Sequence, residues 1–344
     1  MRRATRRSAA ALAALAFAAS GCGAPSDDRA QQPTAVQAAA AARPVTRVLA
    51  ISVDGLRSSV ITQLGRAGAP TLHRLMRTGA ATLDARTERE MTVTLPNHTG
   101  MVTGRRIDAY RGGHGVTWND DRVRPPTVQA AAGHDVSSVF RVVHSAGRRT
   151  AVFASKTKFR LFERSWDAAV DRFRVRLDNA ALTRMTQRDL LRNNRGFTFL
   201  HLSAPDEAGH TRGWSSRAYL DAVRATDRRI GRILRTITTH PRLRDHLVVT
   251  LTADHGGAGT SHSDPSRLVN YRIPFMVWGP TVARGTSLYA LNYDYRKPGS
   301  RRTSYSDARQ PVRNGMVANL ALDLLGLDAV PGSEHDRAQD LDWN

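Results

Sequence analysis

The chain has 344 residues, with 51 Lys or Arg against 30 Asp or Glu, and a formal net charge of +21. Hydrophobic residues make up 41% and charged residues 24%, which excludes a wholly disordered or fibrous chain. The single Cys excludes a disulfide framework and a zinc site of several thiolates. The arginines are spread along the chain without a basic, aromatic-interleaved tract, so we expect no specific nucleic-acid binding.

Residues 1–21 have the layout of an export signal, with arginines first, then an apolar run, then small residues. The run ends at Ala19 and is too short to span a membrane, which takes about 20 residues. Cys22 follows where the lipobox of bacterial lipoproteins is cleaved and acylated, although Ala19 replaces the usual larger aliphatic residue. We therefore expect a lipid anchor on Cys22 that holds the protein on the extracytoplasmic side of the cell membrane, with plain secretion as the alternative.

Three segments are predicted after the signal. Residues 22–44 are rich in Ala, Gln and Pro without an apolar period, which predicts a flexible tether. Residues 45–330 hold the apolar runs of one folded domain, and residues 331–344 read as a polar C-terminal tail. The sequence does not indicate an oligomeric state.

Apolar runs and helical spacing alternate through the domain. Strands are predicted at 45–53, 150–154, 197–202, 247–251 and 273–278. Helices are predicted at 60–75 with an interruption near residues 68–70, at 219–237 and at 316–325. This alternation favours an α/β fold with a mostly parallel central sheet and helices on both faces. Such sheets bind ligands at the carboxyl ends of their strands.

Carboxylates and imidazoles follow three of these strands. The candidate ligands are Asp54, Asp206, His210, Asp254, His255 and His262. Oxygen and imidazole donors without thiolates suit zinc, or manganese less tightly. Several such groups at neighbouring strand ends would repel one another without a cation. Pro205 and Gly209 favour a loop turn rather than a regular helix between Asp206 and His210.

A helix is predicted to begin near Pro96, because proline is tolerated only in the first turn. Thr94 would then be the N-cap residue, with Asn97 three positions later and within its reach. The free N–H groups of a helix N-terminus favour an anion there. A threonine hydroxyl becomes a useful nucleophile when a metal lowers its pKa.

Five sequence blocks together resemble the alkaline phosphatase superfamily, and within it the type I phosphodiesterase/nucleotide pyrophosphatase family. They are ISVDGLR (51–57), TLPNHTGMVTG (94–104), GGHGVTWND (112–120), HLSAPDEAGH followed by GW (201–214) and TADHGG (252–257). The blocks run in the family's order over most of the domain.

The resemblance implies an alkaline-phosphatase-like fold and a phosphoric ester hydrolase with two zinc ions, acting on a small phosphate ester or diester. One ion would be held by Asp54, Thr94, Asp254 and His255, and the other by Asp206, His210 and a third histidine. Thr94 would be the nucleophile that forms a phosphothreonine intermediate, and Asn97 would contact a phosphoryl oxygen.

The third histidine has two candidates. His262 lies seven residues after His255, whereas in larger family members the ligand lies far downstream. His335 is the only later histidine and lies in the predicted tail. We favour His262, because a loop at a strand end positions a ligand better than a mobile tail.

Three alternatives stay open. A phosphomonoesterase would need an added cation for the extra negative charge, and Lys156 or Lys158 could supply it. A phosphoryl transferase would use the same intermediate. A non-catalytic basic surface-binding protein is disfavoured because the ligand set is complete. Walls that select the leaving group would come from loops 105–145 and 156–196, including Trp118 and Trp166.

Overall fold

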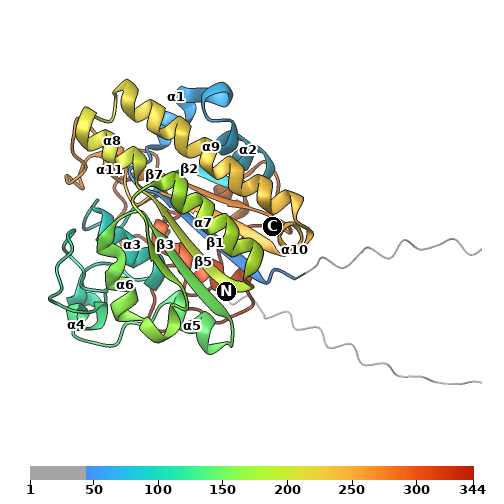
Figure 1. Ribbon diagram of the computed structural model, residues 1–344. Coiled ribbons are helices and arrows are strands. Elements are labelled where there is room, and N and C mark those ends of the chain that lie inside the picture. Colours follow the sequence, from blue (N-terminus) through green and yellow to red (C-terminus); the bar gives the residue numbers. More distant parts are fainter. Residues whose placement is uncertain (1–43) are drawn as a thin grey trace, which may run out of the picture. The chain divides into compact units, whose positions relative to one another are not determined.

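The structure is a computed structural model that describes residues 44–344 (Figure 1). The predicted signal peptide, Cys22 and most of the predicted tether lie outside the described residues. Within the described range, no helix is both long enough and apolar enough to cross a membrane.

The described chain builds one eight-stranded sheet in the order β4-β3-β5-β1-β6-β7-β2-β8. The strands are β1 (Arg47–Val53), β2 (Ala80–Arg86), β3 (Arg149–Ala154), β4 (Phe173–Val175), β5 (Arg195–Leu202), β6 (Leu247–Thr252), β7 (Arg272–Trp278) and β8 (Thr286–Ser287). The run from β4 to β6 is parallel, and β7 is antiparallel to both β6 and β2. The fold is therefore α/β with a mostly parallel sheet, as predicted.

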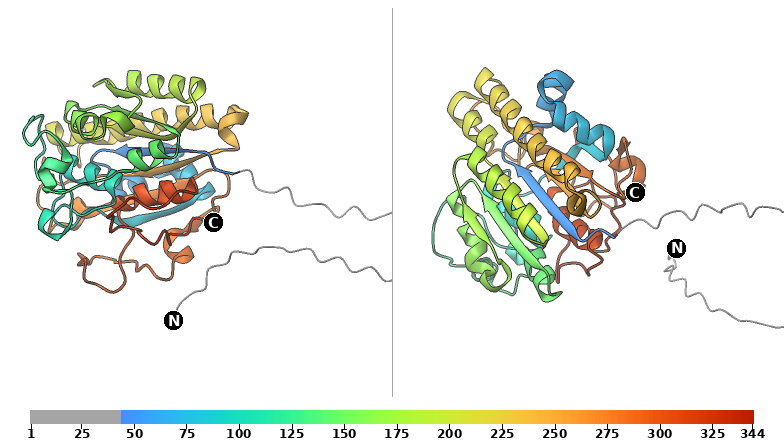
Figure 2. Two further views of the ribbon diagram at one scale, coloured as in Figure 1. Left: turned by 90° about the horizontal axis from the view of Figure 1, so that it is seen from below. Right: turned by 45° about the vertical axis from the view of Figure 1, so that its right-hand side comes forward.

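Helices cover both faces of the sheet, so the molecule has three layers (Figure 2). The α-helices are α1 (Ser58–Gly68), α2 (Pro70–Thr78), α3 (Thr94–Thr103), α4 (Val128–Ala132), α5 (Val139–Ser145), α6 (Arg160–Ser165), α7 (Asn179–Arg192), α8 (Ala204–Arg212), α9 (Arg217–Thr239), α10 (Pro241–Arg244), α11 (Leu268–Tyr271), α12 (Leu288–Leu291) and α13 (Val317–Leu324). Helices α7 and α9 pack together on one face, and α3, α5 and α13 pack together on the other. Every residue of β1, β5 and β6 is buried, as expected for strands covered on both faces.

The register of the central strands brings the candidate ligands to one edge. In β1, Val53 pairs with Leu202 of β5, and Ser52 pairs with Thr252 of β6. The three strands therefore end side by side, and the residues that follow them share the same edge of the sheet. Helix α3 begins beside this edge too, because its first residue, Thr94, lies next to His255.

The segment from Asp206 to His210 is the first of two segments whose backbone differs from the predicted one. The loop turn expected there is wrong, because α8 runs through it as a regular helix. Pro205 lies in the first turn, where no backbone donor is needed. Gly209 serves close packing: a Cβ at this position would lie 2.5 Å from the Trp214 ring.

Residues 331–344 are the second such segment, since they pack against the domain instead of extending from it. The backbone N–H groups of Glu334 and His335 donate to Gly104 O, and Leu341 is buried. His335 Nε2 lies 2.9 Å from Glu88 Oε2. This segment therefore closes over the C-terminal end of α3.

Candidate active site

Three buried carboxylates converge where β1, β5 and β6 end. Asp54 directly follows β1, Asp254 closely follows β6, and Asp206 is in the first turn of α8. His255 Nε2 lies 3.4 Å from an oxygen of Asp54, 3.9 Å from one of Asp206 and 3.1 Å from one of Asp254. The sheet and α8 thus gather three of the predicted carboxylate ligands around one ring nitrogen of a fourth, His255.

Three histidines at this edge present the same nitrogen to the cluster. Each Nδ1 lies next to a backbone carbonyl: His210 with Thr260 O (3.0 Å), His255 with Gly256 O (2.8 Å) and His262 with Thr92 O (2.6 Å). Because a carbonyl only accepts, each neutral ring carries its proton on Nδ1 and leaves a lone pair on Nε2. This is the form in which histidine binds a metal.

His262, the preferred third ligand, lies with the second group. Its Nε2 is 3.0 Å from His210 Nε2, and both face Asp206 Oδ1 at 3.8 and 3.4 Å. Asp206, His210 and His262 form one group with metal-ligand spacing. His335, the alternative, contacts Glu88 and does not belong to this group.

Thr94 lies at the start of α3 with its hydroxyl beside the cluster. It is buried, and its Oγ1 is 3.4 Å from His255 Nε2. Val93 is the N-cap, so Thr94 is the first helical residue and not the cap that the sequence predicted. The difference of one position still leaves the hydroxyl at the helix N-terminus.

Asn97 does not reach Thr94. Its Nδ2 donates to Met91 O at 2.7 Å and Val93 O at 3.1 Å, and its Oδ1 accepts from Glu88 N at 2.9 Å. The amide is completely buried and bonded within the protein. This geometry holds the segment before α3 in place and leaves Asn97 no donor for a phosphoryl oxygen.

Asn119 is the amide that lies beside the start of α3, next to Thr94. Its Oδ1 accepts from Leu95 N at 3.0 Å, so it caps α3 directly after Thr94. Lys158 Nζ donates to the same Oδ1 at 3.0 Å and to the Asn119 carbonyl at 2.6 Å. With its oxygen fixed from two sides, the half-buried Asn119 keeps its NH₂ group as a donor. The sequence analysis did not single out Asn119, which lies 25 positions after Thr94; the available signal was its place in the block GGHGVTWND (112–120).

Strong electrostatic coupling accompanies this crowding. Burial raises the pKa of Asp254 to about 7, and the neighbouring Asp54 adds to the rise. Burial also favours a neutral His255, but Asp254 outweighs it and raises the pKa of this ring to about 9. For Asp54, burial is outweighed mainly by Lys156, which helps hold its pKa well below the usual value. The cluster therefore stabilises positive charge at its centre.

Lys156 bridges the two groups of candidate ligands. Its Nζ lies 2.6 Å from an oxygen of Asp54 and 2.6 Å from one of Asp206. Burial would lower the pKa of Lys156, but these two carboxylates outweigh it and raise the pKa. Lys156 and Lys158 are therefore both placed beside the candidate site, one among the ligands and one behind Asn119.

Two further histidines support the site from behind, and the sequence analysis did not single them out. His201 Nε2 lies 3.0 Å from Asp54 Oδ2, and its Nδ1 lies next to the N–H and hydroxyl of Ser155. His98 Nδ1 lies 2.7 Å from the Thr94 carbonyl, which it can approach only as a donor. The sequence signal for both histidines was that they lie within the quoted blocks 94–104 and 201–214.

The tryptophans proposed as pocket walls are both buried. Trp166 packs among core phenylalanines, and Trp118 belongs to the same core cluster. Trp214 is the aromatic residue at the site, with its ring 5.0 Å from that of His210. Its Nε1 donates to Gly55 O, directly after Asp54.

The residues present fit bound cations. Asp54 Oδ1, Asp206 Oδ1 and Asp254 Oδ2 are buried and have no hydrogen-bond partner among the described residues. Unpaired buried carboxylate oxygens are costly, and the facing lone pairs of His210 Nε2 and His262 Nε2, 3.0 Å apart, add to that cost. A divalent cation in each group would satisfy both, and the oxygen and nitrogen donors suit zinc.

Residues 48–314 match a family model, and the family is described as type I phosphodiesterase/nucleotide pyrophosphatase. GPI ethanolamine phosphate transferase 1 of Chaetomium globosum is 31% identical over 104 residues, which is 30% of this chain and 11% of that protein. The same transferase of Yarrowia lipolytica is 25% identical over 152 residues, or 42% and 16% of the two chains. The chain thus spans a small part of these relatives.

Solved structures show the same fold. Murine ectonucleotide pyrophosphatase/phosphodiesterase 5, an inactive variant in complex with AMP, has a TM-score of 0.64 at 14% identity, covering 86% of this chain and 99% of that one. The human protein of the same name has a TM-score of 0.62 at 13% identity, with 85% and 99% covered.

Proposed function

Because the chain belongs to the type I phosphodiesterase/nucleotide pyrophosphatase family, we propose that it is a two-metal phosphodiesterase with Thr94 as its nucleophile. The observation that carries the proposal is the position of Thr94 Oγ1. It lies 3.4 Å from His255 Nε2, beside three carboxylate oxygens without partners. A hydroxyl in this position can both coordinate a cation and face a phosphoryl group.

Two cations would divide the candidate ligands as the resemblance implies. Asp54, Thr94, Asp254 and His255 would hold one, and Asp206, His210 and His262 would hold the other. When bound, such ions lower the pKa of the threonine hydroxyl and offset charge on the phosphoryl and leaving oxygens. Zinc is the ion that this donor set favours, with manganese as the second choice.

The protein's own groups then set the geometry of the reaction. Thr94 Oγ1 forms a bond to phosphorus while the bond to the leaving oxygen breaks, which gives a phosphothreonine and releases an alcohol or a nucleotide fragment. The Asn119 NH₂ group is placed to donate to a phosphoryl oxygen as its charge grows. Water then cleaves the phosphothreonine and restores the hydroxyl.

Lys156 favours a second candidate, a phosphomonoesterase. A monoester carries roughly one more negative charge than a diester near neutral pH. A lysine 2.6 Å from carboxylates of both ligand groups would attract that charge. The AMP complex of the murine neighbour is a complex with a phosphomonoester, although its name is that of a pyrophosphatase/phosphodiesterase.

A turnover comparison separates the two candidates. We would measure kcat/KM for bis-p-nitrophenyl phosphate and p-nitrophenyl phosphate, with metal content, in the wild type, Lys156→Met and Lys297→Met. Lys297 is exposed and serves as the matched control. The phosphodiesterase proposal expects faster turnover of the diester. Turnover of only the monoester, with a selective loss of it in Lys156→Met, would establish the second candidate instead.

The fungal relatives raise transfer to an alcohol as a variant of the same chemistry. A phosphothreonine can be attacked by an alcohol as well as by water. Adding ethanolamine or glycerol to the turnover assay and analysing the products tests this. If the fraction of product that is phosphorylated alcohol exceeds the mole fraction of the alcohol in the solvent, the enzyme is a transferase. If only inorganic phosphate or a monoester forms, the enzyme is a hydrolase.

We also propose that the enzyme is anchored outside the cell membrane through Cys22. The support is the signal layout before this single cysteine. Cys22→Ser should release the protein from the membrane fraction or block its processing. A variant that fractionates and migrates like the wild type would contradict the anchor.

A further inference from the structure

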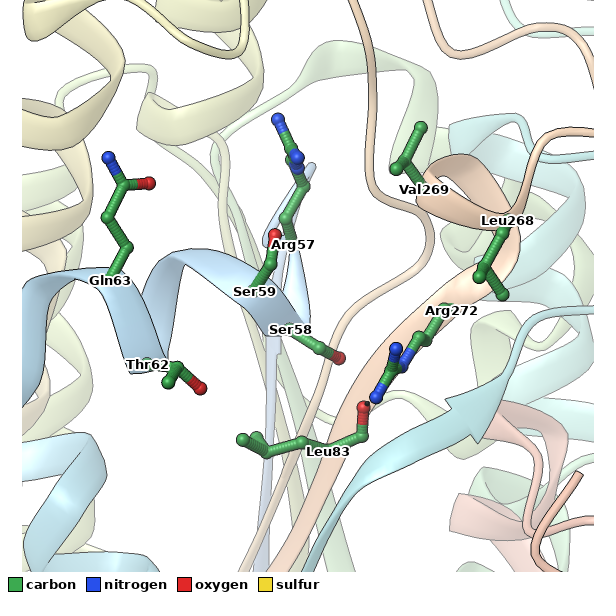
Figure 3. A pocket seen from close by; sticks show the side chains of 9 residues that line it. All are labelled: Arg57, Ser58, Ser59, Thr62, Gln63, Leu83, Leu268, Val269 and Arg272. Carbon is green, nitrogen blue, oxygen red and sulfur yellow. Dashed lines mark hydrogen bonds between the residues drawn. The ribbon is translucent and has the colours of Figure 1, made fainter. Parts of the chain in front are cut away.

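A cavity of about 400 Å³ lies between the start of α1 and the strands β2 and β7 (Figure 3). Leu83, Leu268 and Val269 give it apolar walls, and the guanidinium groups of Arg57 and Arg272 lie at its edge. The polar residues of the first turns of α1 form the opposite side. Its volume is in the range of small-molecule sites, and it holds none of the predicted metal ligands.

Two donors in its lining lack partners. Ser58 is 4% exposed, and its Oγ is buried without a hydrogen-bond partner in the described part of the chain. Arg57 Nε is likewise buried and unpaired, and Arg57 Nη1 has only a long contact of 3.5 Å with Trp214 O. Buried polar groups without partners are costly. Both groups would gain from an acceptor in the cavity.

The charge of the lining is positive. Arg272 Nε lies 2.9 Å from Asp84 Oδ1, but that carboxylate is also paired with Arg86 at 3.1 Å. One carboxylate therefore serves two guanidinium groups, while Arg57 forms no ion pair among residues 44–344. No Asp or Glu belongs to the described lining. An anion is the ligand head group that this arrangement attracts.

We propose that the cavity is a binding site for an amphipathic anion, an alkyl chain with a carboxylate or phosphate head group. The head group would accept from Arg57 and Ser58, with Arg272 adding positive charge. The chain would lie along Leu83, Leu268 and Val269. This assignment gives partners to both unpaired donors and also covers the half-buried apolar wall.

The cavity is distinct from the candidate active site but shares a wall with it. Gly256 N donates to Asn270 O at 2.8 Å, and Gly257 N donates to Val269 O at 3.2 Å. The loop after His255 is thereby held by the same backbone that carries the apolar wall. Because none of the candidate metal ligands lines the cavity, ligand binding there can be measured without turnover and does not depend on the proposed catalytic role.

Calorimetric titration of the mature protein with sodium octanoate tests the site, with 1-octanol and sodium acetate as probes of each half of the ligand. We expect octanoate to bind at least about tenfold more tightly than either, because only it pairs with the donors and covers the wall. Arg57→Gln and Ser58→Ala should weaken octanoate by about tenfold or more. Equal affinity for octanoate and 1-octanol would overturn the proposal.

Gln63→Glu keeps the test informative if the buried variants fold poorly. Gln63 is an exposed lining residue, and the change adds one negative charge at nearly constant shape. It should weaken octanoate and leave 1-octanol unchanged, while Arg66→Gln, on α1 but outside the lining, should change neither. Unchanged octanoate affinity in Gln63→Glu would contradict the site. Octanoate binding that is unchanged in Arg57→Gln but lost in His210→Ala would assign it to the active site and also overturn the proposal.

Discussion

Replacing Asn119 by alanine should slow turnover far more than it destabilises the fold. The substitution removes the NH₂ group beside Thr94, and loss of one such donor to a developing anion costs about 10²–10³ in kcat. It also removes the cap on Leu95 N, which costs about 1 kcal/mol of stability. Metal content should stay near that of the wild type.

Asn97→Ala should behave in the opposite way. It leaves Glu88 N, Met91 O and Val93 O without their side-chain partner, and each unsatisfied buried group costs about 1–3 kcal/mol. We expect a loss of about 3 kcal/mol or more in the free energy of unfolding. Activity at low temperature should fall only with the folded fraction.

Urea unfolding and kcat for bis-p-nitrophenyl phosphate, measured on both variants, separate the two roles. Asn97→Ala with wild-type stability and a large loss in kcat would refute the assignment of the phosphoryl contact to Asn119. An Asn119→Ala variant with unchanged kcat would refute it as well.

Three further changes test the supporting structure. Gly209→Ala would place a Cβ 2.5 Å from the Trp214 ring, so we expect overpacking to lower the free energy of unfolding by about 1–3 kcal/mol. Thermal unfolding measures this loss, and Trp214→Phe should restore part of it. His201→Leu removes the partner of Asp54 and should weaken metal binding by about 10–100-fold in a chelator competition. Burial raises the pKa of Asp336 to about 8, above its unfolded value near 4, so the native state binds the extra proton and stability falls as pH rises between these values. Asp336→Asn should flatten that fall in Tm between pH 5 and 8.

The sequence was most informative about residues that directly follow a buried strand, because the end of the strand determines their position. Apolar runs located β1, β5 and β6, and parallel strands end at a common edge, so the residues after them had to meet. Asp54 and Asp254 were found in this way. A separate local signal, Pro96 in the first turn, placed the N-cap of α3 to within one residue.

It was least informative where distant segments decide. Gly209 suggested a turn, but its role is to let α8 approach Trp214, which local preference does not encode. Asn119 reaches Leu95 through a long loop, and His335 docks on Glu88 from the far end of the chain. Tertiary contacts of this kind override composition, so a polar segment was mistaken for a tail.

The central claim is that Thr94 forms a covalent phosphoryl intermediate, and acid quenching tests it most directly. Wild-type enzyme with its metals, mixed with a diester and quenched during turnover, would be digested and analysed by mass spectrometry beside Thr94→Ala and Thr94→Ser. We expect phosphate on the peptide containing residue 94 in the wild type and in Thr94→Ser, which keeps the oxygen. Thr94→Ala should bind metal, carry no phosphate and lose several orders of magnitude in turnover. Diester hydrolysis near the wild-type rate in Thr94→Ala would show direct attack by water and contradict the account.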